Sequence, residues 1–246
     1  NGQSLFLSIY DSTGLQKYGV IYTNPPGYNT GSGHDMAVDS LENVYITGHV
    51  VTTTSNIQYV YLKYDAAGSL IQEKLSGNLG INVNVKNRIQ ICPSGNSYVG
   101  GNIGYDYYLV KYNSSGDTVW TRRYNGSSNS TDYFNSLCVD NNEQITMTGI
   151  VNGIYGDVGT LRYDSSGTLL WAKTLAGSNG WSDIGKDVVS DTVGAAYVVA
   201  AMDESTTGKT VMIKYNSSGD TAWTLPYDFA PGDYEGPVVI KKIRSL

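Results

Sequence analysis

Short runs of apolar residues follow one another along the whole chain, and clusters of Asp, Asn, Ser and Gly separate them. Examples are YVYLKY at residues 59–64 and AYVVAAM at residues 196–202. Such runs, rich in β-branched and aromatic residues and bounded by turn formers, predict β-strands. Apolar residues do not recur at helical spacing over any useful length. The pattern therefore predicts an all-β protein.

One turn phrase recurs five times, with its tyrosines between 48 and 54 residues apart. Each copy follows one apolar run and precedes another, so each predicts a β-hairpin. Asp or Asn can bond the backbone two residues further on, and Gly supplies the conformation with φ above zero that closes the turn. The copies are YDSTG at Tyr10–Gly14, YDAAG at Tyr64–Gly68, YNSSG at Tyr112–Gly116, YDSSG at Tyr163–Gly167 and YNSSG at Tyr215–Gly219.

A second pair of apolar runs lies between successive hairpins, for example residues 34–39 and 43–50. One repeat therefore holds four short antiparallel strands in about 50 residues, which is typical of a propeller blade. We expect a β-propeller of about five four-stranded antiparallel blades, forming a single domain over residues 1–246. Nearly continuous apolar strands fit this fold, because neighbouring blades cover both faces of each sheet.

The two ends of the chain predict how the ring of blades closes. Leu5–Tyr10 aligns with the third strand of a repeat, and Gly236–Ile243 aligns with the first. The fifth blade would then be composite or incomplete, because no residues are left for its second strand. Three alternatives stay open: the blade closes with three strands, sequence outside this chain supplies the fourth strand, or a neighbouring molecule does so by self-association at the unpaired edge.

The eighth residue after each turn tyrosine is a large aromatic residue in four of the five repeats. A side chain that recurs with the repeat is typical of a structural role, so we expect it to pack on the neighbouring blade. The five residues are Tyr18, Gln72, Trp120, Trp171 and Trp223.

Composition and charge narrow the classes of partner. The 16 basic and 22 acidic residues give a net charge of −6, which offers no basic surface for nucleic acid. No apolar run is long enough for a membrane span, and the first residues lack the basic start of a signal peptide, so we expect a processed chain or a piece of one. Cys92 and Cys138 match no metal-binding spacing, and we expect two buried thiols without a disulfide.

Residues suited to acid–base or nucleophilic chemistry are rare. The chain has two histidines, His34 and His49, and none of the common nucleophile, phosphate-binding or zinc motifs. The stretch Asp140–Glu143 lacks the Gly and the distant Glu of a calcium-binding EF-hand loop and is interpreted as a turn. We therefore expect no catalytic residues, no metal and no cofactor, and we expect that the protein is not an enzyme.

Acidic and aromatic residues gather in the loops that join the fourth strand of one blade to the first strand of the next. Two interpretations stay open: the carboxylates bond loop amides, or they bind sugar hydroxyls beside aromatic rings that cover the apolar faces of a sugar. His34 would lie near these loops, at the mouth of the central tunnel. The candidate ligand-binding residues are Asp132, Tyr133, Trp181, Asp183, Asp233, Tyr234 and His34.

The repeat resembles a known family. The run YLVKYNSSGDTVWTRRYNG followed by DYFNSLCVDNNEQITMTG is similar to the SBBP-type β-propeller repeats of large secreted or surface-anchored bacterial proteins. The resemblance covers essentially the whole chain and implies a propeller in an extracellular or cell-surface setting. YDSSGTLLW at Tyr163–Trp171 is also similar to the tryptophan-docking phrase of quinoprotein propellers, but the chain departs from that group's pattern and length.

Three functions follow from these observations. The first is a non-catalytic extracellular module that binds a protein or a glycan, and the second is a structural building block of a larger surface protein or fibre. The third is a glycan-active propeller enzyme, acting as a glycosidase or a lyase, or a related sugar-binding lectin.

Overall fold

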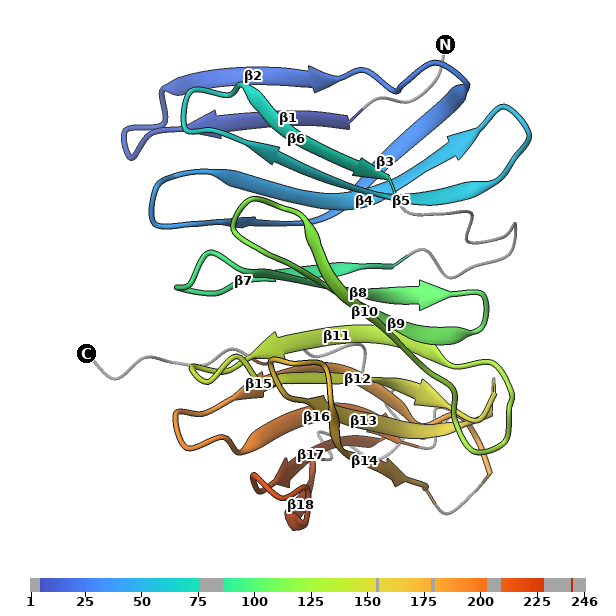
Figure 1. Ribbon diagram of the computed structural model, residues 1–246. Coiled ribbons are helices and arrows are strands. Elements are labelled where there is room, and N and C mark those ends of the chain that lie inside the picture. Colours follow the sequence, from blue (N-terminus) through green and yellow to red (C-terminus); the bar gives the residue numbers. More distant parts are fainter. Residues whose placement is uncertain are drawn as a thin grey trace. The chain divides into compact units, whose positions relative to one another are not determined.

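In the computed structural model, the described residues are 5–75, 86–153, 155–177, 180–202, 209–227 and 240. They form eighteen β-strands and no helix (Figure 1), so none of them belongs to a helix that could cross a membrane. The strands are β1 Leu5–Tyr10, β2 Gln16–Tyr22, β3 Tyr28–Val38, β4 Val44–Thr52, β5 Ile57–Tyr64, β6 Leu70–Leu75, β7 Arg88–Ile91, β8 Ser97–Ile103, β9 Asp106–Tyr112, β10 Thr118–Tyr124, β11 Tyr133–Val139, β12 Ile145–Val151, β13 Asp157–Tyr163, β14 Leu169–Leu175, β15 Ile184–Ser190, β16 Ala196–Met202, β17 Lys209–Tyr215 and β18 Thr221–Tyr227.

The described strands form one two-stranded sheet and four four-stranded sheets. Each four-stranded sheet pairs four consecutive strands in chain order: β3 to β6, β7 to β10, β11 to β14 and β15 to β18 (Figure 1). An antiparallel sheet of this kind is the blade of a β-propeller. The predicted fold class is therefore confirmed, with β1 and β2 as the incomplete blade.

The chain divides into two compact units. Unit 1 consists of residues 1–99 and 111–119, and unit 2 consists of residues 100–110 and 120–246. The prediction that residues 1–246 form a single domain stays a prediction. Of the segment Gly236–Ile243, predicted to supply a first strand, only Ile240 is among the described residues; its amide donates to Asp187 Oδ2 at 3.1 Å.

The recurring turn has the predicted chemistry. In the β5–β6 hairpin, Asp65 Oδ1 accepts the amides of Ala67 at 2.9 Å and Ser69 at 2.8 Å, and Gly68 has a φ of 85°. The final glycine of every copy has a positive φ, which a residue with a Cβ adopts only under strain. These glycines are Gly14, Gly68, Gly116, Gly167 and Gly219.

In four of the five repeats, the eighth residue after the turn tyrosine contacts the turn of the following sheet, as predicted. The indole nitrogen of Trp171 in β14 donates to Ser217 O at 3.2 Å, in the β17–β18 turn. A Cβ atom on Gly219 of that turn would lie 2.6 Å from the Trp171 ring, so the ring fits only against glycine. Trp120 in β10 likewise donates to Ser165 O at 3.2 Å, in the β13–β14 turn.

The same contact recurs in unit 1 with other side chains. The ring of Tyr18 in β2 lies over Gly68, and the amide of Gln72 in β6 lies over Gly116. Trp223 in β18 differs from the prediction: it is 39% exposed and packs edge-on against Tyr197, which lies in β16 of its own sheet.

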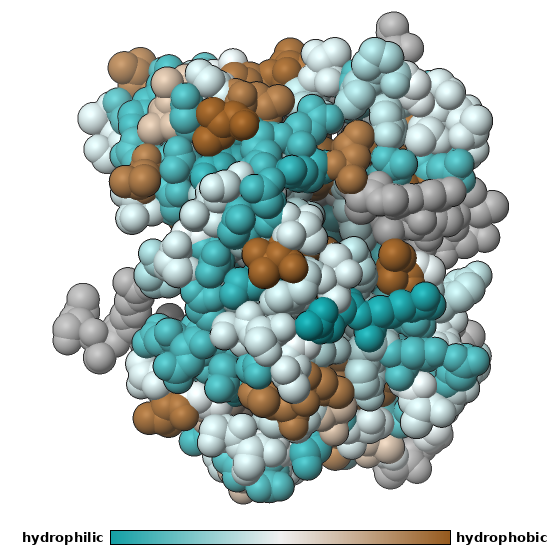
Figure 2. Space-filling view, viewed as in Figure 1, coloured by the Kyte–Doolittle hydropathy of each residue, from teal (hydrophilic) through white to brown (hydrophobic). Residues whose placement is uncertain are grey.

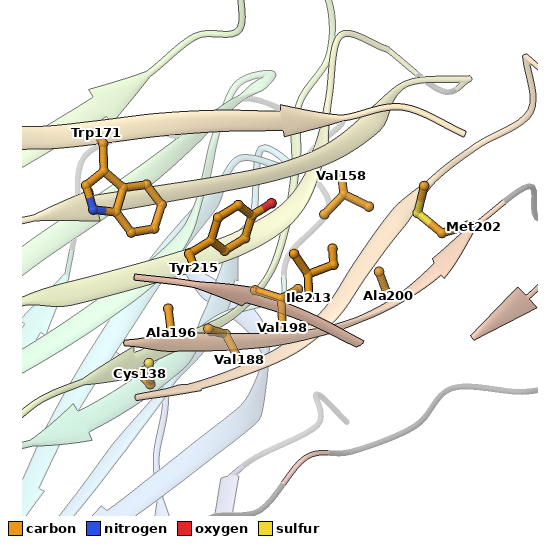
Figure 3. Packing of buried hydrophobic residues seen from close by; sticks show 10 residues of the cluster. All are labelled: Cys138, Val158, Trp171, Val188, Ala196, Val198, Ala200, Met202, Ile213 and Tyr215. Atoms are coloured by element: carbon orange, nitrogen blue, oxygen red, sulfur yellow. The ribbon is translucent and has the colours of Figure 1, made fainter. Parts of the chain in front are cut away.

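Buried apolar residues of unit 2 fill the space between its two complete sheets (Figure 3). Trp171 packs beside Tyr215, with ring centroids 5.6 Å apart, and Val158 and Ile213 continue the cluster away from these rings. Cys138 belongs to this cluster. Cys92 and Cys138 are both buried and neither forms a disulfide, as predicted.

On the face drawn in Figure 2, hydrophilic side chains predominate and hydrophobic ones form small separate patches. Exposed apolar residues that occur singly are normal for a folded protein.

Replacing Trp171 by alanine should lower the free energy of unfolding by about 3 to 5 kcal/mol, because it removes a buried ring and leaves a cavity. Urea titration measures this loss. Trp223→Ala is the matched control, and we expect it to lose less than about 1 kcal/mol because its side chain is partly exposed. Equal losses in the two variants would show that the docking contact does not stabilise the sheets.

Candidate functional site

The two histidines of the chain contact each other in unit 1. His34 lies in β3 at an irregularity in the pairing with β4, between Gly33 and Asp35, and His49 lies in β4. His49 Nδ1 is 2.9 Å from His34 Nε2, and the ring centroids are 4.9 Å apart. Gly33 pairs with Gly48 and Asp35 pairs with Thr47, so His34 is the extra residue of this β-bulge.

Asn87, just before β7, fixes the tautomers of this pair. Its side-chain nitrogen donates to Gly48 O at 2.9 Å, so its oxygen faces His34 Nδ1 at 2.8 Å and accepts the proton there. His34 Nε2 then carries a lone pair and accepts from His49 Nδ1. The hydrogen-bond chain therefore leaves a lone pair on His49 Nε2, the position of a general base.

Burial favours the neutral form of both imidazoles by lowering their pKa values. It lowers the pKa of His34, to which the nearby positive charge of Arg88 also contributes, while the bond to Asn87 acts in the opposite direction. Burial likewise lowers the pKa of His49, and the neighbouring His34 lowers it further. Neutral imidazole is the form that can accept a proton from a substrate near neutral pH.

A cation and a phenol lie close to the pair in the fold. Arg88 Nη1 is 4.0 Å from Asp35 Oδ1, and the Arg88 side chain is half exposed. Tyr59 in β5 is directly opposite His49 in the β4–β5 register, so the two side chains share one face of the sheet. The site thus combines a neutral base with a half-exposed positive charge, and the Tyr59 side chain beside them is buried.

Within the described residues, no group of three or more His, Cys, Asp or Glu side chains is placed to hold a metal ion. The predicted turn at Asp140–Glu143 is confirmed, because Asp140 Oδ1 accepts the amides of Asn142 and Gln144, each at 2.9 Å. The other carboxylate oxygen of Asp140 pairs with the fully buried Arg162. Both oxygens of Asp140 therefore have protein partners.

The structure places the predicted loop carboxylates in unit 2 as buried hydrogen-bond acceptors. Asp132 is 1% exposed and accepts the amides of Gly126 at 2.6 Å and Asn152 at 2.9 Å. Burial raises the pKa of Asp132, and these two amides oppose that rise. Asp183 is 2% exposed and accepts the amide of Gly177. These contacts stabilise loops, and a ligand-binding role for the two carboxylates stays a prediction.

The other predicted site residues lie in different parts of the fold. Trp181 is 48% exposed in a loop of unit 2, and Tyr133 is half-buried at the start of β11. Asp233 and Tyr234 lie outside the described residues. His34 belongs to the histidine pair in unit 1, so it forms a site with His49, Asn87 and Arg88.

His49 and Arg88 were absent from the sequence-based candidates. The turn at Asp39–Asn43 could have indicated His49. It pairs Val38 with Val44, and counting away from the turn along both strands places His34 opposite the residue just before His49. The irregularity that completes the contact has no marker in the sequence. Asn87 aligns with His34 in the repeat, but its bond to Gly48 depends on packing between successive sheets.

Comparisons with known proteins support the fold. No protein-family model and no curated protein sequence matches the chain. Two solved structures of a PL25 ulvan lyase, a polysaccharide lyase, are similar with a TM-score of 0.52 and 11% identity, and one is bound to -[GlcA(1-4)Rha3S]-. Each alignment covers 82% of this chain and 56% of the lyase chain.

The chain spans 56% of the length of these lyase chains, and at 11% identity the likeness concerns the fold. It corrects one expectation from the sequence: the prediction that the protein is not an enzyme is contradicted, because similar solved structures are polysaccharide lyases. The sequence argument counted two separate histidines, whereas the structure places His49 Nδ1 2.9 Å from His34 Nε2. The resemblance to SBBP-type repeats stays a prediction.

The lowered pKa values of His34 and His49 predict how stability changes with pH. Unfolded histidine takes up protons below about pH 6.5, while the folded pair resists them, so the free energy of unfolding should fall as the pH drops from about 7 to about 5. Urea titrations at several pH values measure this slope. The double variant His34→Gln, His49→Gln should show a shallower slope, because it lacks the two histidines. The carboxylates contribute equally to the slope in both proteins, so the difference reports the histidine pair. Parallel slopes would contradict neutral burial of the pair.

Proposed function

We propose that the protein binds and cleaves uronate-containing polysaccharides by β-elimination, with His49 as the general base. The observation that carries this proposal is the hydrogen-bond chain from Gly48 O through Asn87 and His34, which leaves the lone pair on His49 Nε2. This function is the lyase form of the third alternative that the sequence offers, a glycan-active propeller enzyme.

The chemistry requires a base, a positive charge and an acid. His49 Nε2 takes the proton from the carbon next to the uronate carboxylate, and the electron pair of that C–H bond forms a carbon–carbon double bond. The bond to the glycosidic oxygen breaks, and that oxygen gains a proton. One chain becomes two, and no water is consumed.

Two of these requirements have a residue in the site. The guanidinium of Arg88, which is half exposed, neutralises the uronate carboxylate and the negative charge that develops beside it. Tyr59, opposite His49, is buried, so the departing oxygen takes its proton from solvent. Asn87 positions His34, and His34 orients the His49 ring through the bond between their nitrogens, as orienting groups do in other base-containing sites.

Two further considerations support this substrate class. One similar solved structure is described as bound to -[GlcA(1-4)Rha3S]-, which contains a uronate. An extracellular or cell-surface location, which the resemblance to SBBP-type repeats implies, is where polysaccharides of this kind would be met. The location is part of the proposal.

Incubation with ulvan, alginate and polygalacturonate tests the proposal. We expect depolymerisation of at least one polymer with formation of an unsaturated uronate, followed by its ultraviolet absorbance. His49→Gln should slow this reaction by roughly 10²- to 10⁴-fold because it removes the base. Arg88→Gln should weaken it by removing the charge that faces the carboxylate.

Met36→Ala is the control variant, because Met36 lies in β3 with an exposed side chain outside the site. Full activity of His49→Gln would overturn the assignment of the base. Saturated products would indicate hydrolysis by a glycosidase. Saturable binding without turnover would establish the sequence-based expectation of a binding module.

A further inference from the structure

We propose that Tyr155 and Trp181 in unit 2 form an aromatic platform that binds pyranose rings of a polysaccharide. Their rings pack edge to face, with centroids 6.2 Å apart and an interplanar angle of 81°. Tyr155 is 65% exposed and Trp181 is 48% exposed, so the pair presents aromatic surface to solvent. This site is separate from the histidine pair and goes beyond the proposed cleavage activity.

The two rings come from loops of successive sheets that the backbone holds together. Tyr155 lies between β12 and β13, and Trp181 lies between β14 and β15. The amide of Asp183 donates to Gly156 O at 2.8 Å, which joins the two loops one and two residues from the rings. The buried carboxylate of Asp183 also accepts the amide of Gly177. Asp183 therefore joins the two loops through its amide, and its buried carboxylate is occupied by a loop amide.

A third loop continues the same edge of unit 2. The amide of Gly153 donates to Thr131 O at 2.8 Å, and Asp132 accepts the amides of Asn152 and Gly126. This arrangement fixes residues 127–130, whose sequence is Ser-Ser-Asn-Ser and whose side chains are all exposed. Hydroxyl and amide groups beside an aromatic surface suit a ligand rich in hydroxyl groups.

Trp181 does not make the contact with the turn of the next sheet that accounts for Trp120 and Trp171. Trp120 and Trp171 occupy the repeat position and donate their indole nitrogens to turn carbonyls of the next sheet. Trp181 lies outside that position and has no tryptophan counterpart in the other repeats. An exposed pair of aromatic rings leaves apolar surface in water, and the apolar face of a pyranose is a ligand that would cover it.

Affinity gel electrophoresis in the presence of ulvan, xyloglucan, galactomannan or xylan tests the platform. We expect retardation by at least one of these polymers, and Trp181→Ala and Tyr155→Ala should each weaken the binding by about tenfold or more. Trp223→Ala is the matched control, because it also removes a partly exposed tryptophan that packs on a tyrosine. Circular dichroism and urea titration check that each variant is folded.

The outcomes separate this proposal from the proposed cleavage. Binding that persists in His49→Gln and disappears in folded Trp181→Ala supports the platform, whether or not any polymer is cleaved. Binding that is unchanged in both platform variants overturns it. Absence of retardation by all four polymers also overturns it, even if cleavage of a uronate polymer is observed.

Discussion

The contact on which the repeat depends joins the eighth residue after a turn tyrosine to the turn of the following sheet, and four of the five repeats make it. Trp171 can lie flat against Gly219 only because that glycine has no Cβ, and its indole nitrogen satisfies a turn carbonyl that would otherwise face the ring. The turn glycine thus has two reasons to be present: it closes the hairpin with a positive φ of 86°, and it makes room for the preceding sheet. A single residue type serves local geometry and packing, so the repeat keeps its phrase while the flanking strands vary.

Regular docking of this kind brings the loops of successive sheets close together, and the polar residues in those loops then bond across sheets. In unit 2, Asp132 and Asp183 each accept backbone amides from loops that would otherwise have no regular partners. In unit 1, the equivalent neighbour relation lets Asn87 bond the Gly48 carbonyl and reach His34. Buried polar groups must be satisfied, so they hold the loops in one arrangement and the exposed side chains beside them acquire fixed positions.

Much of the fold could be predicted from the sequence because its signals are local. A Tyr-Asp-Ser-Ser-Gly turn requires only neighbouring residues to form, and a period near fifty residues requires only counting. The candidate site was harder, since it depends on events that leave little trace in sequence. The pairing irregularity near Gly33 shifts His34 toward His49, and the face shared by His49 and Tyr59 follows from a register that turn counting gives only approximately. Asp132 and Asp183 were easy to locate as loop carboxylates, but only the three-dimensional contacts reveal that their oxygens point inward to amides.

In a repeat protein, a residue that recurs in every repeat is expected to have a structural role. This argument does not apply to residues that occur in one repeat alone. His34 and His49 are the only histidines, and both lie in the same repeat. Trp181 likewise interrupts the repeat instead of following it. A symmetric scaffold provides equivalent loops, and function requires that one of them differ in charge, hydrogen bonding or exposure. The residues that break the repeat are therefore where chemistry and recognition should be sought, and here they form two groups: a neutral imidazole pair oriented by Asn87, and an exposed aromatic pair held by Asp183.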